Sequence, residues 1–106
     1  MGIYLGLNEV NNGKLNIVNQ NYTLENAFLN KTITNYSNSN IGKIRSYAFR
    51  ECDDLISVYA PNCSYIDDYG FTYCSNLQYI SCVNCESIGY YTFRGCSNLQ
   101  SIIIHI

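Results

Sequence analysis

Hydrophobic residues recur along the second half of the chain at a fixed interval of 22 residues. Between Ile41 and Ile106 the same residue types return without an insertion, which defines three consecutive units. A unit of this length is too small to bury its own apolar face, so consecutive units must stack against one another. The pattern therefore predicts a short solenoid. Six columns carry it: Ile44, Ile66 and Ile88; Tyr47, Tyr69 and Tyr91; Phe49, Phe71 and Phe93; Cys52, Cys74 and Cys96; Leu55, Leu77 and Leu99; Val58, Ile80 and Ile102.

Each unit contains one predicted strand in which inward and outward positions alternate. We expect Leu55, Val58 and Ala60, with their equivalents, to point into the solenoid, and the residues between them to point outward. Ile44 and Phe49, with their equivalents, are expected to line the other side of each coil. The outward strand residues would form two short columns on one open face. They are Ser57, Tyr59, Tyr79, Ser81, Ser101 and Ile103.

The repeated unit resembles the BspA-type leucine-rich repeat, whose pattern is I-G-x-x-A-F-x-x-C-x-x-L-x-x-I-x-I-P. Here it reads IRSYAFRECDDLISVYAP, IDDYGFTYCSNLQYISCV and IGYYTFRGCSNLQSIIIH. The resemblance covers residues 41–106 and implies a mainly β, right-handed leucine-rich-repeat solenoid. It also implies a setting, because such repeats occur in bacterial surface adhesins and in structural proteins of phages and prophages of low-GC Gram-positive hosts. Ala48 of the pattern becomes Gly70 and Thr92, and the proline survives only as Pro61, so we expect the later turns to be looser copies.

Residues 1–40 do not fit the 22-residue pattern and are expected to form a separate segment that docks or caps the repeats of residues 41–106. Ala27-Phe28 lies 21 residues before Ala48-Phe49 and is interpreted as a degenerate cap. Loose alternation between Asn-rich breaks predicts two or three short strands there. The opening letters IYLGLNEV resemble a short segment found near the starts of phage tail and virion proteins.

Composition and charge narrow the function. The chain has 106 residues, enough for one domain, and only 13% of them are charged, with 15 Asn, 10 Ser and 11 Tyr supplying polarity instead. A net charge of −2 offers nothing to a phosphate backbone, so no nucleic-acid partner is expected. Neither a secretory signal nor a membrane span is recognisable. The chain is therefore expected to work inside a cell or to leave it within an assembled particle, and its expected location is the virion, after synthesis in the bacterial cytoplasm.

Candidate chemistry is sparse. The six cysteines include Cys82-Val83-Asn84-Cys85, which has the spacing of a zinc or redox motif. However, all six occupy template positions, so we interpret them as small buried apolar residues, and no second pair completes a four-ligand zinc site. His105 has no nucleophilic partner, and Asp53-Asp54 and Asp67-Asp68 are interpreted as solvated turns. No enzyme activity, metal or cofactor is expected.

A contact surface is the remaining candidate site. It comprises the outward residues and the end of the last strand: Tyr59, Tyr79, Ser81, Ile103, His105 and Ile106. The terminal strand at Ile102–Ile106 has no polar cap, so we expect its edge to be covered by residues 1–40, by a second copy or by another protein. An assembly is favoured, because the chain also has few charges for solubility.

These features predict a non-enzymatic bacteriophage virion protein, most plausibly a capsid decoration or accessory protein that binds by shape and apolar contacts. Its partners would be the major capsid protein, tail components or further copies of itself. The alternative is a tail-associated or receptor-binding module that recognises a host-surface glycan or protein. A fragment of a cellular adhesin is a third possibility.

Overall fold

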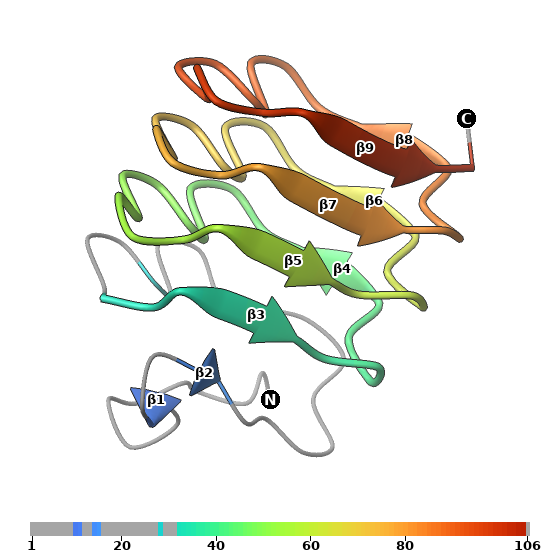
Figure 1. Ribbon diagram of the computed structural model, residues 1–106. Helices are drawn as coiled ribbons and strands as arrows, with labels where there is room; N and C mark the ends of the chain where they lie inside the picture. Colours follow the sequence, from blue (N-terminus) through green and yellow to red (C-terminus); the bar gives the residue numbers. More distant parts are fainter. Residues whose placement is uncertain (1–9, 12–13, 16–27, 29–31, 106) are drawn as a thin grey trace.

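Short strands, stacked in parallel apart from the antiparallel pair β1 and β2, make up the regular part of the protein (Figure 1). The computed structural model describes residues 10–11, 14–15, 28 and 32–105, and these contain strands and turns but no helix. The larger sheet has the order β1-β2-β3-β5-β7-β9, and the smaller has the order β4-β6-β8. The strands of the larger sheet are β1 (Val10–Asn11), β2 (Lys14–Leu15), β3 (Asn35–Ser37), β5 (Ser57–Tyr59), β7 (Tyr79–Cys82) and β9 (Ser101–Ile104). Those of the smaller sheet are β4 (Lys43–Ile44), β6 (Tyr65–Ile66) and β8 (Ser87–Ile88).

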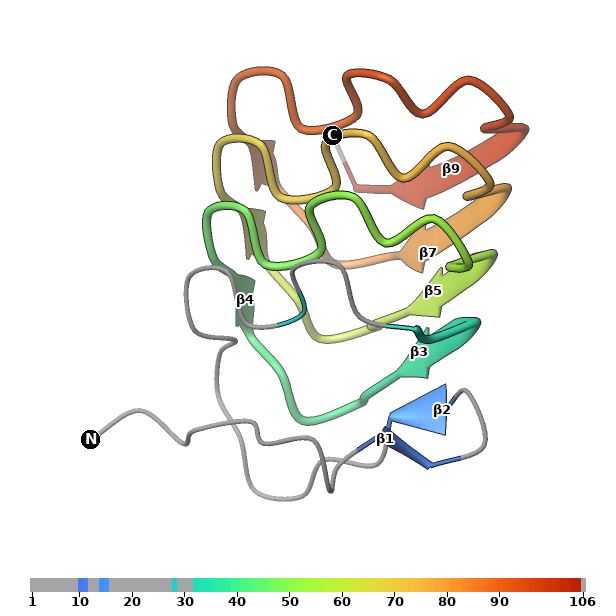
Figure 2. The same ribbon diagram turned by 90° about the vertical axis from the view of Figure 1, so that its left-hand side faces the viewer.

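The strand register confirms the 22-residue interval. In the larger sheet Ser57 pairs with Tyr79 and Tyr79 with Ser101, while in the smaller sheet Ile44 pairs with Ile66 and Ile66 with Ile88. Every residue therefore lies directly above its equivalent in the preceding coil. Figure 2 shows the two sheets on different sides of the coils, with turns joining them. The predicted leucine-rich-repeat solenoid is confirmed.

The core is built from columns of identical or similar side chains. The rings of Phe28, Phe49, Phe71 and Phe93 stack in order, with centroid separations of 4.6, 4.9 and 5.9 Å. The inward strand residues Val58 and Ile80 and the smaller-sheet residues Ile44 and Ile66 are almost completely buried. Inward and outward positions thus follow the predicted alternation, and in the last coil the inward residues keep their columns but are less buried.

Each coil turns through two residues with left-handed backbone conformation. Tyr47, Tyr69 and Tyr91 have φ values of 58°, 61° and 55°, so the three turns share one geometry. The backbone N–H groups of Phe49 and Phe71 donate to the carbonyl oxygens of Gly70 and Thr92 at 2.9 and 3.0 Å. The sequence departures from the family pattern at Gly70 and Thr92 leave this turn geometry unchanged, because the backbone bonds form whether the side chain is a methyl, a hydrogen or a hydroxyethyl group.

The stack extends before residue 41. Strand β3 pairs in parallel with β5 at the same 22-residue offset, and the N–H of Phe28 donates to the oxygen of Ala48 at 2.6 Å, as Phe49 does to Gly70 in the next coil. Ile41 is buried in the column that continues as Cys63 and Cys85. The residues assigned to a separate segment 1–40 therefore include part of an additional coil. Whether residues 1–40 also dock to a partner stays a prediction.

The last coil departs from the predicted burial. Ile102 and Ile88 were expected to point inward, yet their side chains are 42% and 36% exposed. They occupy the same columns as the buried Ile80 and Ile66, but within the described residues no coil lies above them. The described strands of residues 1–40, β1 and β2, lie at the opposite edge of the sheet from β9. They do not cover the edge of β9, which was one of the three expected arrangements.

Candidate interaction surface

The outward residues of β3, β5, β7 and β9 form a flat surface that we call the strand face. It has two columns, Asn35, Ser57, Tyr79 and Ser101 in one, and Ser37, Tyr59, Ser81 and Ile103 in the other. Tyr59, Tyr79 and Ile103 are 52%, 47% and 52% exposed, and Ser81 is half-buried between them. Tyr59 and Tyr79 come from neighbouring strands and are offset along them by two residues. Parallel pairing of four strands thus brings together residues spread over almost 70 positions of the chain.

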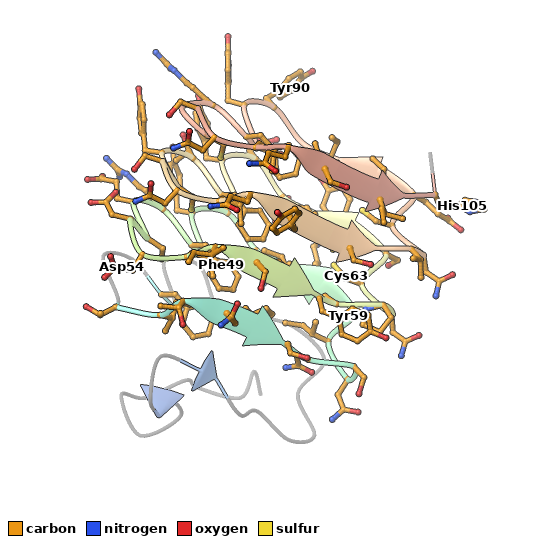
Figure 3. All side chains as sticks on the ribbon, viewed as in Figure 1. Phe49, Asp54, Tyr59, Cys63, Tyr90 and His105 are labelled. Carbon is orange, nitrogen blue, oxygen red and sulfur yellow. The ribbon has the colours of Figure 1, made fainter. Side chains whose placement is uncertain are left out.

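The four strands of the strand face carry no formal charge at neutral pH, and next to them in the sheet Lys14 of β2 pairs with Asn35 at one edge of the face. Within residues 32–105, none of the Asp, Glu, Lys or Arg side chains falls in the segments 34–39, 56–61, 78–83 or 100–105, which contain these strands. Figure 3 shows Asp54 at the turn-bearing edge of the stack, well away from Tyr59 at the end of β5. The ten charged residues elsewhere in this range are Lys43, Arg45, Arg50, Glu51, Asp53, Asp54, Asp67, Asp68, Glu86 and Arg94.

The structure places most of the sequence-predicted surface residues together. His105 is exposed just beyond β9, and its backbone N–H donates to the oxygen of Cys85 at 2.9 Å. Ile106 lies outside the described residues. Sequence reasoning missed Asn35 and Ser37, which extend the strand face by a fourth strand. Both residues lie 22 positions before outward residues of β5, so the 22-residue interval could have identified them. They were missed because the repeat was expected to begin at residue 41.

The cysteines pack as the column pattern predicts. All six are free thiols, and all are buried except Cys96, which is half-buried in the last coil. In three successive coils the thiol donates to the carbonyl oxygen of a phenylalanine in the coil below. These bonds join Cys52 to Phe28, Cys74 to Phe49 and Cys96 to Phe71, at 2.9, 2.9 and 3.1 Å. The cysteines therefore act as small core residues that also satisfy backbone acceptors.

Burial keeps most of these thiols protonated. The neighbouring Cys52 thiol and burial raise the pKa of Cys74, and burial raises the pKa of Cys96 to about 12. Interaction between the neighbouring Cys63 and Cys82 thiols lowers the pKa of Cys63 and raises the pKa of Cys82. Because reactive cysteines are thiolates in accessible, electropositive sites, the buried cysteines have the character of structural residues.

The carboxylates make local contacts with the coils. Asp67 pairs with Arg45, with 3.5 Å between Nε and Oδ2, and its hydrogen bond raises the pKa of the Tyr65 phenol. Asp68 accepts the backbone N–H of Tyr90 at 2.8 Å, while Asp53 and Asp54 are exposed. Among the residues that the structure describes, no cluster of three or more His, Cys, Asp or Glu side chains could hold a metal ion. In the same part of the chain, no helix has the length and apolarity needed to cross a lipid bilayer.

Parallel strands recur at a 22-residue interval, and each has an apolar core column on one side and an open face on the other. This arrangement defines a leucine-rich-repeat solenoid. The chain belongs to the BspA-type leucine-rich repeat family, since residues 14–106 match the family described as "BspA type Leucine rich repeat region (6 copies)". The match begins well before residue 41, in agreement with the position of β3. None of the curated proteins and none of the solved structures compared with the chain matches it. Leucine-rich repeats commonly mediate protein–protein interaction and are generally not catalytic.

Proposed function

We propose that this protein is a non-enzymatic structural component of a bacteriophage virion, namely a capsid decoration protein that presents its repeats at the particle surface. The observation that carries a binding role is the strand face, where two exposed tyrosines stand on a rigid, uncharged sheet. Amphipathic aromatic residues held on regular strands are common contact residues of recognition surfaces. The virion setting is supported by the BspA-type repeats together with the opening letters IYLGLNEV, which resemble the starts of phage virion proteins.

In this proposal the part of residues 1–40 that precedes β3 attaches the protein to the shell, and the coils from β3 onward face outward. A decoration protein adds buried area between shell subunits, and binding to the assembled state stabilises the particle by mass action. The alternative role is that of a tail-associated module that recognises the host surface through the strand face. Both roles use the protein as a binding surface, but they differ in the number of copies per particle.

Particle composition tests the proposal. Prophages would be induced in a strain that carries the gene, and density-purified particles would be analysed by quantitative mass spectrometry. Capsid decoration predicts a copy number comparable to that of the major capsid protein, whereas a tail-tip module predicts only a handful. Absence of the chain from purified particles would overturn the virion role.

A further inference from the structure

We propose that the strand face binds an uncharged polysaccharide. This inference rests on the proposed role of the strand face as a binding surface, but not on the position of the protein in a particle. Three properties of the face favour this ligand: the lack of charge on its four strands, its serine hydroxyls and exposed tyrosine rings, and its small area.

Charge disfavours the common polyanionic ligands. Strands β3, β5, β7 and β9 hold no cation to contact a phosphate, sulfate or carboxylate, although Lys14 of the neighbouring strand β2 pairs with Asn35 at the edge of the face, and the net charge of the chain is −2. Nucleic acids and acidic polysaccharides depend on such cations for most of their affinity and would be repelled by the field of this chain. A neutral ligand has no such penalty. Its binding would also be insensitive to salt, because no ion pair is formed.

The polar groups of the face suit a ligand rich in hydroxyls. Each serine hydroxyl can donate one hydrogen bond and accept two. Ser57 is paired with Asn35, whereas within the described residues the hydroxyls of Ser81 and Ser101 have no hydrogen-bond partner in the protein. They lie side by side with Tyr59 and Tyr79 on adjoining strands. A sugar chain could therefore be contacted by donors and acceptors along both columns.

The two tyrosines supply apolar contacts. Neither ring stacks on another aromatic ring among the described residues, so both remain available to a ligand. Strand geometry separates their Cα atoms by roughly 8 Å, a distance that an oligosaccharide of two or three residues spans. The C–H faces of pyranose rings pack well on aromatic rings. Tyrosine loses little conformational entropy on binding because it has only two side-chain torsions.

The size of the face disfavours a folded protein as the main occupant. Four strands at about 4.8 Å spacing and six residues at about 3.3 Å each cover roughly 400 Å² in projection. A stable protein complex takes about 800 Å² of surface from each partner. An extended carbohydrate chain needs only a narrow track, and repetition of the protein on a particle would multiply a weak affinity.

Binding of defined glycans to the full chain tests the proposal. Affinity electrophoresis would compare neutral probes (dextran, amylose, galactomannan and xyloglucan) with anionic ones (hyaluronan, heparin and polygalacturonate) at about 0.05 and about 0.5 M NaCl. We expect retardation by at least one neutral probe, unchanged at the higher salt, and none by the anionic probes. Retardation by the anionic probes, or its loss at the higher salt, would overturn the proposal. So would failure of every neutral probe, or binding to a capsid or host protein alone. The last result would leave the virion role intact.

Variants identify the surface. Tyr59→Ala and Tyr79→Ala should each weaken binding about tenfold, and the double variant should abolish it, because each removes one aromatic contact. The matched control is Tyr90→Ala, which removes a ring that is 77% exposed but lies outside the strand face. Circular dichroism establishes that each variant keeps the fold. A loss of binding in the Tyr90 variant equal to that in the Tyr59 variant would refute the assignment to the strand face.

Discussion

Truncation of two phenylalanines in one column tests whether stability comes from neighbouring coils. Phe49 is completely buried, with Phe28 and Phe71 stacked on its two sides at 4.6 and 4.9 Å and the edge of Tyr36 at 4.8 Å. Phe93 occupies the same column in the last coil. It is half-buried and stacks only on Phe71, at 5.9 Å. The two residues therefore share a chemical type and a template position but differ in the number of neighbours.

At the centres of their expected ranges, the losses in the free energy of unfolding differ by a factor of about two to three. Phe49→Ala leaves a closed cavity and should lower the free energy of unfolding by about 3–5 kcal/mol. Phe93→Ala removes a ring that is already partly hydrated and leaves an open hollow that water can enter, so its cost should be about 1–2 kcal/mol. For a chain of this size, a difference of about 2–3 kcal/mol moves the urea midpoint by about 1–2 M.

Urea unfolding measures the difference. The chain has 11 tyrosines and no tryptophan, so tyrosine fluorescence and circular dichroism are suitable probes. If Phe49→Ala does not fold, the milder pair Phe49→Leu and Phe93→Leu keeps the comparison, with the same order of cost. Equal costs at the two positions would refute the view that each coil is stabilised mainly by the coils next to it.

Three further results are expected. Folding raises the pKa of Cys96 to about 12, so the unfolded chain loses this proton first as pH rises above about 8.5, and stability should fall by up to about 1.4 kcal/mol per pH unit for this thiol. Cys96→Ser should make the fall of the urea midpoint between about pH 8.5 and 10 less steep, while the raised pKa values of Cys74, Cys82 and Cys85 keep part of the slope. Gly95 has φ +78°, and a Cβ there would lie 2.3 Å from Cδ1 of Tyr73. Gly95→Ala should therefore lower the free energy of unfolding by about 1–2 kcal/mol. In a Tyr73→Ala background the loss should be smaller, as a double-mutant cycle of unfolding would show. Deletion of residues 63–84 removes one whole coil and keeps every column aligned, so it should give a folded protein with a lower melting temperature. Deletion of the shorter segment 63–73 misaligns the columns and should prevent folding. If circular dichroism showed the shorter deletion folded and the longer one unfolded, the stacking scheme would be contradicted.

The sequence predicted the coils well because their packing repeats without interruption from Ile44 onward. Side chains at the same template position meet in the structure, so a spacing in the sequence becomes a contact in space. The alternation within each strand also placed Tyr59 and Tyr79 on the open face correctly. These parts of the fold depend on local pattern alone.

The first coil was hidden partly because one of its inward positions carries a polar residue, although Ile33 and Tyr36 at the other inward positions are buried and apolar. Asn38 occupies the inward position of Ala60, and it is buried because its side chain bonds locally: Oδ1 accepts the backbone N–H groups of Asn40 and Ile41, and Nδ2 donates to the hydroxyl of Tyr36 at 3.3 Å. A buried polar residue cannot be recognised as a core residue from a pattern of hydrophobic positions. The spacing from Phe28 to Phe49 is also one residue shorter than the later intervals. Exposure in the last coil escaped prediction for another reason, since template position alone does not say whether a neighbouring coil is present.

The stacking also determines how the molecule carries mechanical load. Each coil is attached to the next by the hydrogen bonds of short strands and by columns of side chains, all of which point along the axis of the stack. Tension along this axis would open one interface at a time, since each coil contacts only its neighbours. Tension along the strands would instead shear all the bonds between two coils together and meet far more resistance. A ligand drawn across the strand face, parallel to its strands, would therefore pull against the stronger direction of the protein.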